Sequence, residues 1–131
     1  MDIRDTKTEK IRSFKDLRAW QRAHDLAIQT YLLTKKFPKE ELFGITNQMR
    51  RAAVSVPSNL AEGFSRKSSK EKTQFYAISK GSLTELESQY LISRDLGYVS
   101  GQEFADIEGK IEQVGKIITG LAKSTRIERA L

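Results

Sequence analysis

Positively charged side chains, which bind phosphates, gather in three segments of this sequence. Of the 23 Lys and Arg residues, thirteen lie in residues 1–18, 62–72 and 121–131, and each of these segments has a net charge of +2. The three segments therefore account for the net charge of +6 of the whole chain. The candidate nucleic-acid-binding residues are Arg66, Lys67, Lys70, Lys72, Lys123, Arg126 and Arg129.

The two groups of cations differ in how well they suit the helices that carry them. Lys123, Arg126 and Arg129 lie near the predicted carboxyl end of a helix, where the helix dipole favours cations. The other four surround the predicted amino end of a helix, where the dipole favours anions. Three interpretations remain open: solubilising charges at an exposed turn, a site for RNA or DNA, and a site for an anionic membrane surface.

A second set of polar side chains forms one stripe along a predicted helix over residues 46–63. The stripe consists of Gln48, Arg51, Ser55, Asn59 and Glu62, and it accompanies an apolar stripe of Ile45, Met49, Ala52, Ala53, Val56 and Leu60. The pair of stripes predicts a helix that is packed on both sides, in a bundle that associates with its own copies. Alternatively the polar stripe faces solvent, or Ser55 and Asn59 bond to backbone that Pro57 leaves free. Pro57 also predicts a kink in this helix.

The sequence offers little for catalysis or metal binding. His24 is the single histidine, which excludes the paired Glu-x-x-His pattern of di-metal bundles, and we expect it to pack beside Trp20. Cysteine is absent, so no thiolate is available. Gly109 and Gly120 share one face of a predicted helix, where they either admit a neighbouring helix or are merely tolerated. We therefore expect no enzymatic activity and no cofactor or metal.

Helical spacing of apolar residues predicts an all-α protein. Residues 1–12 are expected to form a flexible charged tail, and residues 13–131 a single four-helix-bundle domain. Ser13 with Asp16, Ser68 with Glu71, and Ser100 with Glu103 have the spacing of capping boxes, and Gly97 follows the third helix. The helices are expected over residues 13–37, 46–63, 68–96 and 100–131. Short connections favour an antiparallel up-down-up-down bundle, which would bring the three basic segments to one pole.

The expected core faces of the other helices follow the same spacing. The first helix is expected to bury Leu17, Trp20, Ala23, Ala27, Tyr31 and Leu33, and the third to bury Phe75, Ile78, Ser82, Leu86, Gln89 and Leu96. The fourth has a heptad seam of Phe104, Ile107, Ile111, Val114, Ile118, Leu121 and Thr125. No apolar run is long enough for a membrane span, and the charged start does not resemble a signal peptide. We therefore expect a cytoplasmic protein.

Several blocks resemble the 23S ribosomal RNA intervening-sequence proteins, a bacterial four-helix-bundle family. They are residues 14–21, 37–46, 48–63, 81–87 and 94–98, and the block from Gln48 to Gly63 is the most specific. The resemblance implies a left-turning up-down bundle that assembles as a ring-like homopentamer. It extends more distantly to the accessory proteins of diversity-generating retroelements, which are associated with a reverse transcriptase and nucleic acid.

Together these observations favour a non-enzymatic oligomeric accessory protein whose basic pole binds the phosphates of RNA or DNA, or of a nucleic-acid enzyme complex. The alternative is a protein-interaction scaffold that does not bind nucleic acid directly.

Overall fold

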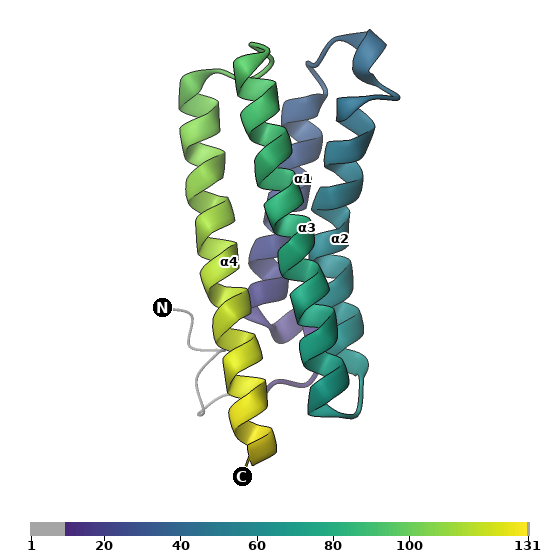
Figure 1. Ribbon diagram of the computed structural model, residues 1–131, viewed down its shortest axis with the longest axis vertical. Coiled ribbons are helices and arrows are strands. Elements are labelled where there is room, and N and C mark those ends of the chain that lie inside the picture. The colour runs from purple at the N-terminus through teal and green to yellow at the C-terminus, as the bar shows by residue number, and fades with distance from the viewer. Residues whose placement is uncertain (1–9, 131) are drawn as a thin grey trace.

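The computed structural model describes residues 10–130, and within this range it is all-helical, with side chains described up to Ile127. Four long helices lie side by side (Figure 1). They are α1 (Arg18–Thr34), α2 (Ile45–Ser65), α3 (Ser69–Asp95) and α4 (Gly101–Ala130), with short 3-10 turns η2 (Phe14–Asp16) and η3 (Lys39–Glu41). The predicted all-α class and the four helices are confirmed. The flexible tail predicted for residues 1–12 lies mostly outside the described residues.

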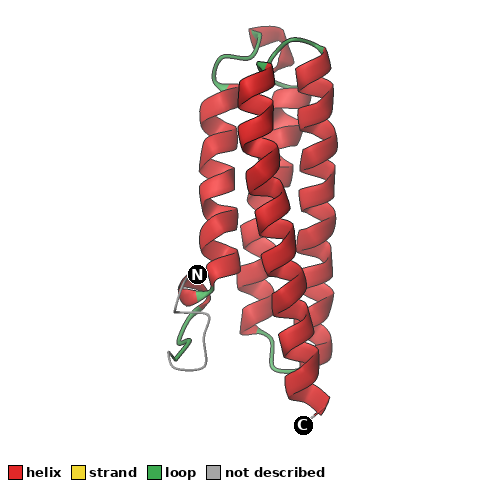
Figure 2. Cartoon of the chain, turned by 90° about the vertical axis from the view of Figure 1, so that its left-hand side faces the viewer, coloured by secondary structure: helices red, strands yellow, loops and turns green. Residues whose placement is uncertain are grey.

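The connections between the helices lie at the two ends of the bundle. The α1–α2 and α3–α4 connections lie at one end (Figure 1), which we call the balanced pole because residues 35–44 and 94–103 contain four basic and four acidic side chains. The α2–α3 connection and the carboxyl end of α4 lie at the other end (Figure 2), which we call the basic pole. The basic pole carries Arg66, Lys67, Lys70, Lys72, Lys123 and Arg126.

The predicted core faces of α2 and α4 are confirmed. Met49, Ala52, Ala53, Val56 and Leu60 of α2 are buried, and Ile45 packs against the core from its edge. The heptad seam of α4 is buried except for Leu121, which is half-buried. In both helices the apolar side chains by themselves mark the buried stripe, because few other large apolar residues compete with them.

The predicted core faces of α1 and α3 were partly wrong. Tyr31 is 42% exposed, Ile78 53% and Leu96 54%, whereas Thr30 and Ser93 are fully buried. The hydroxyl groups can be buried because each returns a hydrogen bond to its own helix: Thr30 Oγ1 donates to the Leu26 carbonyl at 3.0 Å, and Ser93 Oγ to the Gln89 carbonyl at 2.9 Å. The buried residues missed by the prediction are Ala19, Leu26, Thr30, Thr34, Tyr76, Ser79, Leu83, Tyr90 and Ser93.

The helix ends follow local sequence signals with one displacement. The capping box of Ser13 and Asp16 is present, but it closes the turn η2, and the extended Leu17 (ψ 126°) separates this turn from α1. Consequently α1 begins at Arg18 and ends at Thr34, short of Phe37. Gly97 adopts φ +80°, and its N–H donates to the Arg94 carbonyl at 3.0 Å, as in the predicted glycine end of α3. Pro57 is buried inside α2, and the kink expected there stays a prediction.

Close contact between α2 and α3 fixes the position of their connection. Gly63 lies against α3 so tightly that an added Cβ would be 2.8 Å from the Cβ of Phe75 and from the ring of Tyr76. Higher in the same interface, Ser79 Oγ donates to the Val56 carbonyl at 2.7 Å. The cations that follow Gly63 are therefore presented from a rigid support. No helix within residues 10–130 has both the length and the apolar character needed to cross a bilayer.

Candidate nucleic-acid interface

The α2–α3 connection presents two of its cations to solvent. Ser68 caps α3, and its Oγ accepts a hydrogen bond from the Glu71 N–H at 3.1 Å. Lys67 and Lys70 stand on either side of this cap, are exposed, and form no ion pair with another described residue. Two ammonium groups thus flank the amino end of α3, whose unpaired N–H groups also attract anions.

The other two cations of the connection are held by contacts within the chain. Arg66 Nη2 lies 2.6 Å from Glu62 Oε2, and its guanidinium lies 4.7 Å from the centroid of the Phe75 ring. Lys72 Nζ donates to the Phe64 carbonyl at 2.6 Å and lies 5.1 Å from the centroid of the Phe64 ring. These contacts limit where the two charges can move, and Glu62 partly neutralises Arg66.

The carboxyl end of α4 brings further cations to the same pole (Figure 1). Lys123 and Arg126 are exposed and form no ion pair within the described residues. The side chain of Arg129, also predicted for this site, lies outside the described part of the chain. Among the described side chains, the basic pole therefore has cations from two segments that are distant in sequence.

A cavity of about 670 Å³ opens beside these cations, between α1, α3 and α4. Its rim includes Arg18, Lys72 and Lys116, and no carboxylate lines it. The sequence prediction missed Arg18 and Lys116. The spacing of four between Lys116 and Gly120 is the signal that places both on one face of α4, but only the fold shows that Arg18 lies across from them.

The polar stripe of α2 is divided by the fold into two parts. Ser55 Oγ lies 2.8 Å from Ser82 Oγ of α3, and Asn59 Nδ2 donates to both the carbonyl and Oγ of Ser55 at 2.9 Å. Asn59 therefore does not bond to the Ala53 carbonyl that Pro57 leaves without its helical partner. Glu62 pairs with Arg66, as described above.

The remaining members of the stripe, Gln48 and Arg51, are exposed, and their side chains form no hydrogen bond with other described residues. The neighbouring Arg50, which the sequence analysis did not select, instead links two helices. Its Nε donates to Thr34 Oγ1 at 2.9 Å, and its guanidinium lies 4.8 Å from the centroid of the Tyr31 ring. Arg51 is thus the guanidinium available to another molecule.

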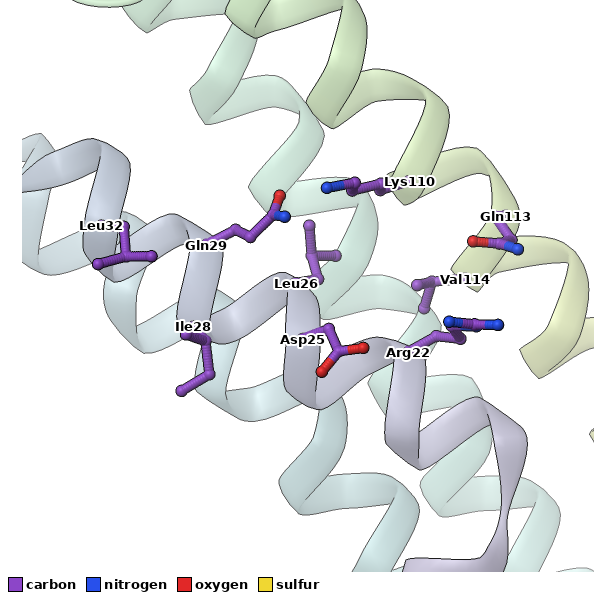
Figure 3. Close-up of a pocket in the computed structure, with 9 residues that line it drawn as sticks. All are labelled: Arg22, Asp25, Leu26, Ile28, Gln29, Leu32, Lys110, Gln113 and Val114. Carbon is purple, nitrogen blue, oxygen red and sulfur yellow. The ribbon is translucent and has the colours of Figure 1, made fainter.

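A second cavity, of about 440 Å³, lies between α1 and α4 (Figure 3). Its charged lining residues are Arg22, Asp25 and Lys110, and Figure 3 shows no second carboxylate or histidine with which Asp25 would form an acid–base pair. His24 is exposed and stacks on Trp20, with ring centroids 4.9 Å apart. Among the described residues, no group of three histidines or acidic residues is placed to hold a metal ion.

Three titratable groups with shifted pKa values lie in the half of the bundle toward the balanced pole. Burial raises the pKa of Tyr90 to about 12, although its hydrogen bond with Thr30 acts in the opposite direction. The hydrogen bond from its hydroxyl to Glu41 raises the pKa of Tyr98. The hydrogen bond from Lys36 lowers the pKa of Glu103. Burial explains the shift of Tyr90, and hydrogen bonds explain those of Tyr98 and Glu103.

Comparison with known proteins connects this fold to one family. A family model described as "23S rRNA-intervening sequence protein" matches residues 15–120. A solved structure from Bacteroides thetaiotaomicron, described as a protein with unknown function from the S23 ribosomal protein family, is similar with a TM-score of 0.75 and 17% identity. The similarity covers 80% of this chain and 95% of that chain, and at this identity it shows the fold alone. No curated protein matches the sequence.

Proposed function

The chain belongs to the 23S rRNA-intervening sequence protein family, and from this premise we propose that it is a non-enzymatic, homo-oligomeric accessory protein that binds RNA phosphates through its basic pole. The observation that carries the proposal is the pair of exposed ammonium groups of Lys67 and Lys70 at the amino end of α3. Cations at this position oppose the helix dipole, so the fold does not require them. We place the protein in the cytoplasm, where RNA is available.

The proposed binding is electrostatic. It assumes that consecutive helices of the bundle run in opposite directions, up-down-up-down. This arrangement groups the α2–α3 connection with the carboxyl end of α4, in agreement with the positions of the connections in Figure 1. Contacts to phosphates position a protein on a nucleic acid without reading its sequence. Affinity that depends on such contacts falls steeply as the salt concentration rises, because salt cations compete with Lys and Arg side chains for the phosphates.

Self-association is the second part of the proposal, and exposed apolar side chains support it. Large apolar side chains on the surface of one chain include Ile28, Tyr31, Leu32, Val54, Ile78, Ile92 and Leu96. An apolar hollow of about 400 Å³ between α1 and α2, lined by Trp20, Tyr31 and Val54 among others, offers a surface for a second copy. The family resemblance implies five subunits, which would repeat the basic pole around a ring.

Reversal of the four charges at the α2–α3 connection tests the RNA site. The wild-type protein is expected to bind RNA with micromolar or tighter affinity at low salt, measured by fluorescence anisotropy. The variant with Arg66, Lys67, Lys70 and Lys72 changed to Glu is expected not to bind. If these four cations contact phosphates, log K falls with log salt with a slope of roughly −3 for single-stranded RNA. Unchanged binding by the variant would reject the assigned site.

The exposed apolar surface also supports the alternative function, a protein-interaction scaffold. In that case the same charge reversal leaves partner capture intact, whereas changing the exposed Gln48 and Arg51 splits the oligomer and abolishes capture. Light scattering at several concentrations measures the oligomer directly. A nucleic-acid enzyme, such as a reverse transcriptase, is a partner compatible with either function.

A further inference from the structure

We propose that the cavity at the basic pole accepts one unpaired nucleotide of the bound RNA, with its base between apolar walls and its phosphate at the cationic rim. The inference rests on the proposed RNA-binding function and adds to it a preference for single-stranded RNA. Its basis is the combination, in one cavity, of apolar walls and three cations from three helices.

The cavity has the size and walls of a ligand site. Its volume of about 670 Å³ falls within the roughly 300–1,000 Å³ range of pockets for small molecules. Leu17 and Tyr76 are buried wall residues, and Leu121 is half-buried. Gly120 lines the cavity from α4, and a Cβ added there would meet no atom within 4 Å. A side chain at residue 120 would therefore enter open space beside the cavity walls.

The rim provides positive charge that suits a phosphate. Arg18, Lys72 and Lys116 come from α1, α3 and α4, and no lining residue is acidic. Lys116 is paired only loosely with Glu112, at 3.6 Å, and both side chains are more than two-thirds exposed. An exposed pair of this kind contributes little and is readily exchanged for a phosphate. The guanidinium of Arg18, which also has an interaction within the chain, matches phosphate oxygens in its planar shape.

The two other cavities lack this combination, although each is large enough for a small ligand. The α1–α4 cavity carries the carboxylate of Asp25, which repels an anion. The α1–α2 hollow has apolar walls but neither Lys nor Arg in its lining. An unpaired base can leave the stack and enter an apolar space, whereas a base inside a duplex is held by its partner and its neighbours. Single-stranded RNA is thus the form that the basic-pole cavity fits.

A single substitution narrows the cavity without adding or removing a charge. Gly120→Leu places its side chain in open space, and leucine favours a helix more than glycine does, so the bundle is expected to fold. Gly109→Leu is the matched control, since Gly109 lies on the same face of α4, is equally open, and does not line the cavity. Thermal unfolding followed by circular dichroism verifies that both variants are folded.

The experiment compares the binding of a short single-stranded oligoadenylate with that of an RNA duplex, by fluorescence anisotropy at one low salt concentration. Gly120→Leu is expected to weaken oligoadenylate binding about tenfold, an effect comparable to the loss of one stacked base, and to leave duplex binding unchanged. Gly109→Leu is expected to change neither. These results together support a nucleotide site in the cavity.

Other outcomes separate the failure of this inference from the failure of the proposed function. If the wild-type protein binds RNA and Gly120→Leu changes neither affinity, the cavity is not a nucleotide site, although RNA binding stands. If Gly120→Leu weakens the binding of oligoadenylate and of the duplex equally, the region acts only as a general phosphate surface, and the inference is overturned. If the wild-type protein binds neither RNA, both proposals fall.

Discussion

The two poles of the bundle are built from similar helix ends but treat charge differently. At the balanced pole, Lys36 pairs with Glu103, and the Tyr98 hydroxyl donates to Glu41 Oε2 at 2.8 Å. At the basic pole, Lys67 and Lys70 have no acidic partner among the described residues, and Arg66 has Glu62. The balanced pole shows that these helix connections can be formed with equal numbers of both charges. The surplus of cations at the basic pole is therefore a separate property of this surface, which folding did not require.

The interior of the bundle also differs between the two poles. Toward the balanced pole, Thr30 Oγ1 lies 2.7 Å from the Tyr90 hydroxyl, and Ser93 Oγ lies 3.3 Å from Met49 Sδ, all of them buried. Toward the basic pole, the space between α1, α3 and α4 stays open. The half toward the balanced pole thus contains buried hydrogen bonds between helices, although Thr46 Oγ1 and Gln89 Oε1 find no partner among the described residues. The half toward the basic pole contains the cavity and the surplus cations.

The largest expected effect is a loss of RNA affinity on charge reversal at the basic pole but not at the balanced pole. Changing Lys67 and Lys70 to Glu is expected to lower RNA affinity on the order of a thousandfold, because each reversal removes an attraction and adds a repulsion, and is repeated in each subunit of the proposed oligomer. Changing Lys35 and Lys39 to Glu at the balanced pole makes the same change in net charge and is expected to have little effect. Glu near the amino end of α3 suits the helix dipole, so loss of binding would not reflect unfolding. Equal losses in both variants would mean that net charge, rather than the basic pole, governs binding.

A smaller contrast tests how rigidly the basic pole is supported. Gly63→Ala is expected to lower the free energy of unfolding by about 2 kcal/mol, because the new Cβ overlaps Phe75 and Tyr76. Gly81→Ala in the middle of α3 meets no atom within 4 Å and is expected to raise it by up to about 1 kcal/mol. Urea unfolding measures both. Equal stability of the two variants would show that α2 and α3 separate easily at this pole.

The last contrast concerns the half of the bundle toward the balanced pole and is expected only at high pH. Because the pKa of Tyr90 is raised from 10.0 to about 12, the folded protein retains the phenol proton that the unfolded chain loses in this range. Stability from this group is complete below pH 10 and is lost as pH rises to 12, by about 3 kcal/mol in total. Tyr90→Phe lacks this ionisation, so its stability is expected to fall less over the same range. Parallel pH profiles of the two proteins in urea unfolding would contradict the assignment.

Much of the local structure could be predicted from the sequence. The apolar spacing in α2 and α4 predicted their buried faces. The glycine at residue 97 predicted the end of α3, and in the structure it adopts φ +80° there. The spacing failed at Tyr31 and Ile78, which are large and apolar but exposed, while Thr30 and Ser79 occupy the core. Hydropathy does not reveal that a hydroxyl will be buried, because its burial depends on the hydrogen bond it makes after the helices have packed.

The sequence by itself determined the helices, most of their ends, and the segments that carry the surplus cations, because helical periodicity and capping depend on residues a few positions apart. Only the tertiary structure decided which cations share a surface. It brought Arg18, Lys72 and Lys116 to one cavity, and it left Arg51 exposed while Arg50 joined two helices. These outcomes depend on how each helix is rotated against its neighbours, and that rotation is set by the packing of the whole core.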